Sequence, residues 1–244
     1  MPFKDLFKKF KNKTPDSQYP EDALSSLEMD TLNNEFTEKI QQCKNSPQRT
    51  YDLCRDLSEK GSTLALYHLG HFYEQGDGQK QYPEQAAECY WRASKKNLPE
   101  AQYNLALLYA QGTLGQVDLV SAHYWFTEAA QLGLAPAQFN LATFFEDGLG
   151  CIEDLDKAFT LYEKAAQSGF VKAWHNLAVM HYSGKGTDKD LIKAYAWTLL
   201  AAKAQVKEAV EAEPVLTSEL ETEALIAGKQ LLEELEVKYR TYLA

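Results

Sequence analysis

This chain lacks the features that usually indicate a membrane, a secreted location or a nucleic-acid partner. No stretch approaches the ~18 consecutive apolar residues that cross a bilayer. The first residues, MPFKDLFKKFKNK, carry lysines but no apolar signal core, so we expect a cytoplasmic protein. Lysine and arginine total 25 against 35 acidic residues, and the net charge of −10 argues against nucleic acid, because phosphate binding requires clustered cations.

Recognisable catalytic and metal-binding motifs are also missing. There is no HExxH, no GxSxG, no P-loop and no dinucleotide-binding fingerprint. The cysteines show no CxxC spacing, so we expect reduced thiols rather than disulfides or a metal centre. They are Cys43, Cys54, Cys89 and Cys151. We therefore predict that the chain is not an enzyme and needs neither metal nor cofactor.

A strict internal repeat is the dominant feature of the sequence. The stretch AQYNLALLYAQG at 101–112 returns as AQFNLATFFEDG at 137–148 and AWHNLAVMHYSG at 173–184, with a weaker copy, ALYHLGHFYEQG, at 65–76. Four positions recur every 36 residues, and this regularity predicts stacked, similar structural units. They are Ala65, Ala101, Ala137 and Ala173; Leu69, Leu105, Leu141 and Leu177; Gly76, Gly112, Gly148 and Gly184; and Ala86, Ala122, Ala158 and Ala194.

Each unit predicts two amphipathic helices. In the second copy, Ala101, Leu105 and Leu108 recur at the spacing of one helix face, and Ala122 and Phe126 do so in the second helix. An aspartate stands four residues before the second-helix alanine in three copies, and we interpret it as an N-cap. These aspartates are Asp118, Asp154 and Asp190. The residues predicted to close the second helices are Asn97, Gly133, Gly169 and Gln205.

These units carry a family resemblance. AQFNLATFFEDGLGCIEDLDKAFTLYEKAAQSG (137–169) resembles Sel-1-like repeats, which are shorter-looped relatives of the tetratricopeptide repeat, and KAYAWTLLAA (193–202) is similar to the last repeat of many bacterial members. The resemblance covers residues 61–205. It implies an all-α fold, an α-solenoid of antiparallel helix pairs whose first helices line a concave surface. It also implies a role in assembling or regulating protein complexes.

The ends of the chain differ from the repeats. We expect a basic amphipathic tail and flexible linker at 1–31, a degenerate leading helix pair at 32–60, four repeats at 61–205, and an acidic linker with a C-terminal capping helix at 206–244. A capping element is expected because a solenoid must shield its terminal core from water. Residues 207–236 hold nine glutamates and two lysines, a net charge of −7, and we favour a solvated outer face for them.

The basic tail is the part that the repeats do not explain. Apolar residues at helical spacing lie beside lysines, a pattern typical of a short helix on an anionic membrane surface. Docking on the acidic C-terminal helix or on a partner protein is the alternative. A single anchor of this kind gives only weak, peripheral contact with the inner membrane face. The tail residues concerned are Phe3, Leu6, Phe7, Phe10, Lys8 and Lys9.

The first helices also predict a binding groove. Positions 2, 3, 6, 9 and 10 after the opening alanine lie opposite the buried positions and include an aromatic row and an asparagine row. Asparagine both donates and accepts hydrogen bonds, so this row can bind the main chain of a peptide; packing inside the solenoid is the alternative. The predicted groove residues are Tyr67, His68, His71, Tyr103, Asn104, Leu107, Gln111, Phe139, Asn140, Thr143, Glu146, His175, Asn176 and Tyr182.

The sequence therefore predicts a non-enzymatic scaffold or adaptor that binds a protein or extended peptide in this groove. Two alternatives stay open. One is an immunity or inhibitor protein that neutralises a secreted effector, a role that the resemblance implies for some members of the family. The other is a hydrolase with a site in the groove that depends on His71 or Glu74. The sequence specifies neither the partner nor the oligomeric state.

Overall fold

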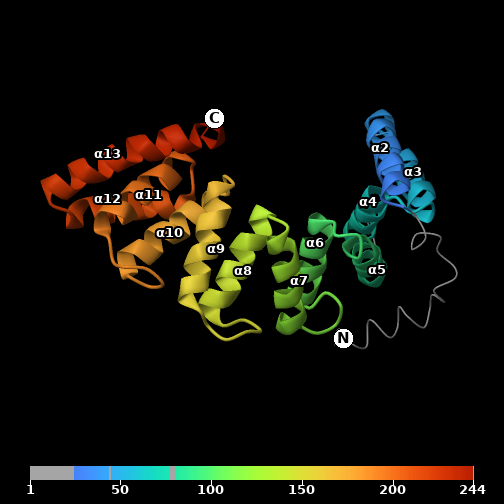
Figure 1. The fold of residues 1–244 in the computed structure, drawn as a ribbon, viewed down its shortest axis with the longest axis horizontal. Coiled ribbons are helices and arrows are strands. Elements are labelled where there is room, and N and C mark those ends of the chain that lie inside the picture. Colours follow the sequence, from blue (N-terminus) through green and yellow to red (C-terminus); the bar gives the residue numbers. More distant parts are fainter. Residues whose placement is uncertain (1–24, 44, 77–80, 244) are drawn as a thin grey trace. The chain divides into compact units, whose positions relative to one another are not determined.

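The computed structural model describes residues 25–43, 45–76 and 81–243, which form twelve α-helices and one 3₁₀-helix and contain no strand (Figure 1). The predicted all-α fold is confirmed. The chain divides into two compact units, residues 1–129 and 130–244, and each is described by itself.

In the first unit, helices α2 to α6 pack against their neighbours along the chain. Helix α4 packs on α3 and on α5, α5 packs on α6, and α2 packs on both α3 and α4. Phe36, Leu57 and Leu69 form part of the core beneath α2 and α3. The helices are α2 (Ser26–Cys43), α3 (Pro47–Glu59), α4 (Thr63–Gln75), α5 (Pro83–Ser94), α6 (Pro99–Ala110) and α7 (Leu119–Gln131), and the boundary between the units falls within α7.

Helix α2 begins earlier than expected, inside the segment assigned to the linker. Ser25 and Glu28 form a reciprocal capping box: the Ser25 amide donates to Glu28 Oε2 at 2.9 Å, and the Glu28 amide donates to Ser25 Oγ at 3.3 Å. The expected boundary at residue 32 is corrected accordingly, because the helix already starts at Ser26.

The leading helix pair follows the same 36-residue register as the repeats. Pro47 is the first residue of α3 and Pro83 the first residue of α5. The turn after each second helix also repeats, with a positive φ at equivalent places. Such a conformation strains most residues and favours glycine. The φ angles are 99° at Gly61, 57° at Asn97, 86° at Gly133, 79° at Gly169 and 61° at Gln205.

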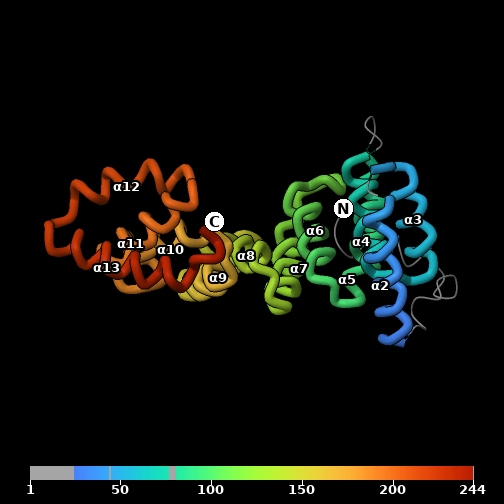
Figure 2. The backbone as a smooth tube through the Cα atoms, turned by 90° about the horizontal axis from the view of Figure 1, so that it is seen from above, coloured from blue at the N-terminus to red at the C-terminus, as the bar shows by residue number. Residues whose placement is uncertain are grey.

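The second unit contains two regular helix pairs and a different ending. Helix α8 packs on α9, α9 on α10, and α10 on α11, while α12 and α13 both pack on α11. Figures 1 and 2 show α13 running beside α11. The helices are α8 (Ala135–Asp147), α9 (Leu155–Gln167), α10 (Val171–Ser183), α11 (Leu191–Lys203), α12 (Lys207–Glu219) and α13 (Thr222–Tyr239), followed by the 3₁₀-helix η2 (Arg240–Tyr242).

Helix α12 occupies most of the segment expected to be an acidic linker. Its Ala209 stands 36 residues after Ala173 and is completely buried, so α12 takes the place of a fifth first helix. Pro214 lies inside the helix and conceals this pattern in the sequence, because proline usually ends a helix. The predicted capping role falls to α13, whose Tyr239 packs on Trp174 and Trp197 with ring centroids 5.3 and 5.8 Å apart.

The predicted aspartate caps are present in all three copies. Asp118 Oδ1 accepts the amide of Ser121 at 3.0 Å, and Asp154 Oδ1 accepts the amide of Lys157 at 3.0 Å. Asp190 accepts the amide of Lys193 at 2.9 Å. The recurring aspartates therefore stabilise the helix starts.

Candidate functional site

The first helices have one buried face and one more open face, as their periodicity predicts. Ala101 and Leu105 on α6 are fully buried. On the other face, Tyr103 and Asn104 are half-buried and Gln111 is exposed. Leu107 on α6 and Asn140 on α8 are half-buried as well, so the predicted groove positions lie mostly at the edge of the core.

In the first unit, the predicted aromatic groove residues pack against neighbouring helices. The Tyr67 ring lies 5.5 Å from His71 and 6.0 Å from Tyr90 on α5. His68 packs against Phe36 on α2, with ring centroids 5.1 Å apart. These side chains thus contribute to packing, which was the alternative to a binding role.

A hydrogen-bonded group links the two helices of the first repeat. The Tyr90 hydroxyl donates to Oε2 of Glu74 at 2.7 Å. Burial is the largest cause of the raised pKa of Tyr90; the bond to Glu74 raises it further, and a hydrogen bond with Asn104 lowers it. Asn104 also bonds the hydroxyl of Tyr67. Its amide is therefore already engaged within the protein.

The third repeat has the same arrangement. The Tyr162 hydroxyl donates to Oε2 of Glu146 at 2.7 Å and lies 3.1 Å from Oγ1 of Thr143. Burial raises the pKa of Tyr162 most, the bond with Glu146 adds to this, and hydrogen bonds with Thr143 and Asn176 oppose it. Glu146, Thr143 and Asn176 were all predicted to line the groove, and here they surround one buried tyrosine.

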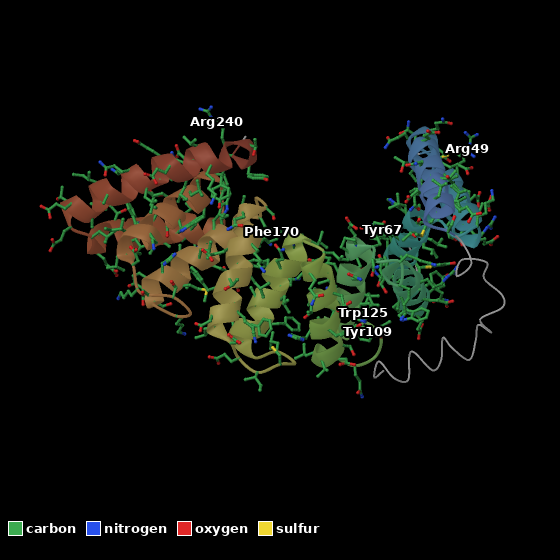
Figure 3. The ribbon with its side chains drawn as sticks, in the orientation of Figure 1. Arg49, Tyr67, Tyr109, Trp125, Phe170 and Arg240 are labelled. Atoms are coloured by element: carbon green, nitrogen blue, oxygen red, sulfur yellow. The ribbon has the colours of Figure 1, made fainter. Side chains whose placement is uncertain are left out.

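Three predicted groove residues come together in an open cleft of the second unit. Phe139, His175 and Asn176 line a space of about 570 Å³. The Phe139 ring forms its apolar side and packs 5.1 Å from Phe170, which is labelled in Figure 3 at the turn before α10. The remaining lining residues are Val171, Lys172, Ala204, Gln205, Val206, Lys207 and Glu208.

The cleft is polar on the side where α12 begins. Lys207 and Glu208 open that helix, and Lys172 extends from α10. Burial lowers the pKa of His175, and the carboxylate of Glu208 partly opposes this effect. A neutral imidazole, an amide and charges of both signs therefore surround an aromatic ring. Such a surface can hydrogen-bond a peptide main chain and receive an apolar side chain.

Tyr182, another predicted groove residue, lies outside this cleft. Its side chain is 40% exposed, and its hydroxyl donates to Oε2 of Glu219 on α12 at 3.0 Å. Leu107, Gln111 and Asn140 likewise do not line the cleft. The structure thus gathers only part of the predicted groove into one cavity.

The residue that follows the opening alanine in the second, third and fourth repeats was not predicted to have a role. Gln102, Gln138 and Trp174 are buried, and each donates a hydrogen bond to a carbonyl eight residues earlier. The acceptors lie in the last turn of the preceding second helix, where carbonyls lack helical partners. The signal in the sequence was a side chain with an N–H donor at the same position of three repeats. Lys207 and Glu208, at the start of α12, were missed as well, because they follow the last full repeat.

The tail residues Phe3, Leu6, Phe7, Phe10, Lys8 and Lys9 lie outside the described residues. Within residues 25–43, 45–76 and 81–243, no helix is long and apolar enough to cross a bilayer. The same residues contain no cluster of three or more His, Cys, Asp or Glu side chains that could hold a metal ion.

Comparison with known proteins identifies the repeat. Four consecutive segments, residues 63–98, 99–134, 135–170 and 172–206, match the Sel1 repeat. A solved Sel1 repeat protein from Oxalobacter formigenes has a TM-score of 0.64 at 24% sequence identity, over 72% of this chain and 72% of that chain. No curated protein matches this chain.

Two further solved structures are similar. c5321, a protective antigen present in uropathogenic Escherichia coli strains, has a TM-score of 0.53 at 25% identity over 79% of this chain, which spans about half of the antigen (49%). The immunity protein Pa5087 from Pseudomonas aeruginosa has a TM-score of 0.44 at 14% identity over 94% of this chain and 88% of that chain, and this likeness is too low to support an argument.

Proposed function

Because this chain belongs to the Sel1 repeat family, we propose that it is a non-enzymatic interaction scaffold that binds a protein or extended peptide at the cleft of its second unit. A solenoid of repeats offers an extended surface for such binding. The family match supports the scaffold architecture, and the proposed partner class comes from the chemistry of the cleft.

The observation that carries the proposal is the meeting of Phe139, His175 and Asn176 in one open cleft. These residues come from two successive first helices, so a ligand that contacts all of them extends across repeats. Phe139 offers apolar surface and the imidazole of His175 offers a hydrogen bond. The Asn176 amide already bonds Tyr162, but an amide has more donor and acceptor sites than this one bond uses. A peptide segment presents both apolar side chains and polar main-chain groups along its length, whereas a partner with a purely apolar surface would leave the polar groups of the cleft without hydrogen bonds.

The groove residues suggested for a hydrolase have structural partners that favour the scaffold. Glu74 accepts the hydroxyl of Tyr90, and His71 packs against Tyr67 and Tyr90. These contacts account for both residues without a substrate. The hydrolase alternative would require that replacing His71 or Glu74 abolish a measurable turnover while the fold is retained.

Site-specific photocrosslinking in the native host tests the proposal. A benzoyl-phenylalanine at position 175 places the reactive group in the cleft. One at position 237 is the matched control, because Val237 on α13 is 77% exposed and does not line the cleft. We expect a defined crosslinked product from position 175 and none from position 237. Equal products from both positions, or a product from 237 alone, would remove the cleft as the binding surface.

The crosslinked partner also separates the two versions of the scaffold. Recovery of a secreted effector toxin would identify the immunity function, whereas recovery of a cellular protein complex would identify an adaptor. Both outcomes require the cleft, so the choice between them does not affect the test of the binding surface.

A further inference from the structure

A second, smaller cleft lies elsewhere on the second unit. Its volume is about 320 Å³, and it shares no lining residue with the cleft described above. Helices α9, α11 and α13 supply most of its walls, which combine four apolar or aromatic side chains with four polar or charged ones. The lining residues are Phe159, Glu163, His181, Thr187, Lys193, Trp197, Leu231 and Leu235.

His181 is the unusual member of this set. Its side chain is only 5% exposed, and among the described residues its Nδ1 atom has no hydrogen-bond partner. The ring is hydrogen-bonded to the backbone of Asp188. Burial lowers the pKa of His181, so the imidazole is neutral near neutral pH. With its other nitrogen donating to a carbonyl, Nδ1 carries a lone pair and acts as an acceptor.

The equivalent position in the first repeat has a hydrogen-bond partner that His181 lacks. His181 stands where the earlier repeats have Tyr73, Tyr109 and Phe145. In the first repeat, the Tyr73 ring meets Tyr51 edge to face at 6.4 Å, and the two hydroxyls are hydrogen-bonded. Phe159 occupies the place of Tyr51 three repeats later and meets His181 at 5.3 Å. The ring contact is kept, but phenylalanine supplies no donor.

We propose that this smaller cleft binds an aromatic ring that carries a hydrogen-bond donor, a phenol or an indole, with the donor directed at Nδ1 of His181. Phe159 and Trp197 can pack against such a ring. The volume suits one ring, since ligand pockets begin at roughly 300 Å³. Nδ1 is itself closed to solvent, so a wall side chain must rotate on binding. This site is independent of the proposed scaffold function.

The test compares p-cresol with toluene, which is similar in shape but lacks the hydroxyl. Binding is followed through the imidazole carbon–proton signals of the full chain by NMR, with the His181 signal assigned from a variant. We expect p-cresol to shift the His181 signal and to bind roughly tenfold more tightly than toluene, as one added hydrogen bond allows. Equal affinity for the two ligands, or no shift at His181, would overturn the proposal.

Two variants show whether the imidazole is the source of the preference. His181→Phe restores the ring type of the third repeat and should bind p-cresol and toluene alike. His123→Gln, on α7 and outside both clefts, should keep the preference. A preference that survives in His181→Phe contradicts the proposal. N-acetyltyrosinamide identifies the source of the ring: tighter binding than p-cresol indicates a polypeptide side chain, and weaker binding indicates a free phenol.

Discussion

The hydroxyl of Tyr162 donates a hydrogen bond of 2.7 Å to Glu146. The residues at these two positions change together from one repeat to the next. The first repeat has the same pair, Tyr90 and Glu74, also at 2.7 Å. The second repeat has Phe126 in place of the tyrosine. There the glutamate is absent too, and Ala110 takes its place. The tyrosine and the glutamate are thus present together or absent together in these three repeats. This pattern indicates that the contribution of each side chain to stability depends on the other.

A double-mutant cycle tests this coupling. Tyr162→Phe removes the donor and should destabilise the second unit by about 1 kcal/mol, as a partly solvent-accessible hydrogen bond to a carboxylate predicts. Tyr162→Phe with Glu146→Ala reproduces the pair of the second repeat and should lose less stability than the two single changes added together. Urea unfolding followed by circular dichroism measures all four proteins. Strict additivity would show that the two side chains are independent.

The aspartate caps make a second prediction. Asp118→Ala removes the acceptor for the Ser121 amide, which is bonded at 3.0 Å, and should destabilise the protein by about 1 kcal/mol. Asp156→Ala is the control, because Asp156 lies in the first turn of α9 and is not its N-cap. Thermal unfolding should separate the two variants. Equal effects would mean that local charge, and not capping, explains the recurring aspartate.

Much of this fold could be predicted from the sequence because its determinants are local and repeated. Helix positions follow from the spacing of residues such as Ala101 and Leu105, which are fully buried. The turns after the second helices were also predictable. Asn97 and Gln205 are the two non-glycine residues with positive φ among the described residues, and both stand where the other repeats have glycine. Periodicity reveals such positions even when the residue type changes.

The rest could not be predicted because it depends on contacts between elements. The cleft includes Lys207 and Glu208, which follow the last full repeat. They line the same cleft as His175 only because α12 packs back onto the preceding helices. Proline at 214 hid α12. Asn176 resembles a free groove amide in the sequence, but its hydrogen bond with Tyr162 appears only when the second helix packs beside it. Exposure alone therefore does not identify a binding residue.

The half-buried histidines predict a loss of stability in mild acid. Burial is the first cause, and the nearby His71 the second, of the lowered pKa of His68. A folded-state pKa below the unfolded value means that the unfolded chain binds protons first as the pH falls. The stabilising contribution is therefore complete above about pH 6.5 and is lost as the pH falls through the lower folded value.

Denaturant midpoints at several pH values measure this effect. The natural chain should begin to lose stability as the pH falls below about 7.5, and His68→Gln should lose less over the same acid range. Some acid sensitivity should remain, because burial also lowers the pKa of His175 and of His181. Above about pH 8 the two proteins should respond to pH alike. An identical acid response would exclude His68 as a contributor.

The contact between α13 and α11 depends on the absence of a side chain at Gly228. A Cβ atom there would lie 2.6 Å from Cδ1 of Tyr195, which is buried on α11. Alanine is the better helix former by about 1 kcal/mol, so an isolated α13 would gain from Gly228→Ala. In the folded protein the clash should dominate, since overpacking costs about 1–3 kcal/mol. Gly228→Ala should therefore destabilise the second unit and speed amide hydrogen exchange throughout α13.

Gln230→Ala, on the exposed side of the same helix, should leave exchange unchanged. Slower exchange in Gly228→Ala would mean that helix propensity, and not the close approach to Tyr195, sets the stability of this cap.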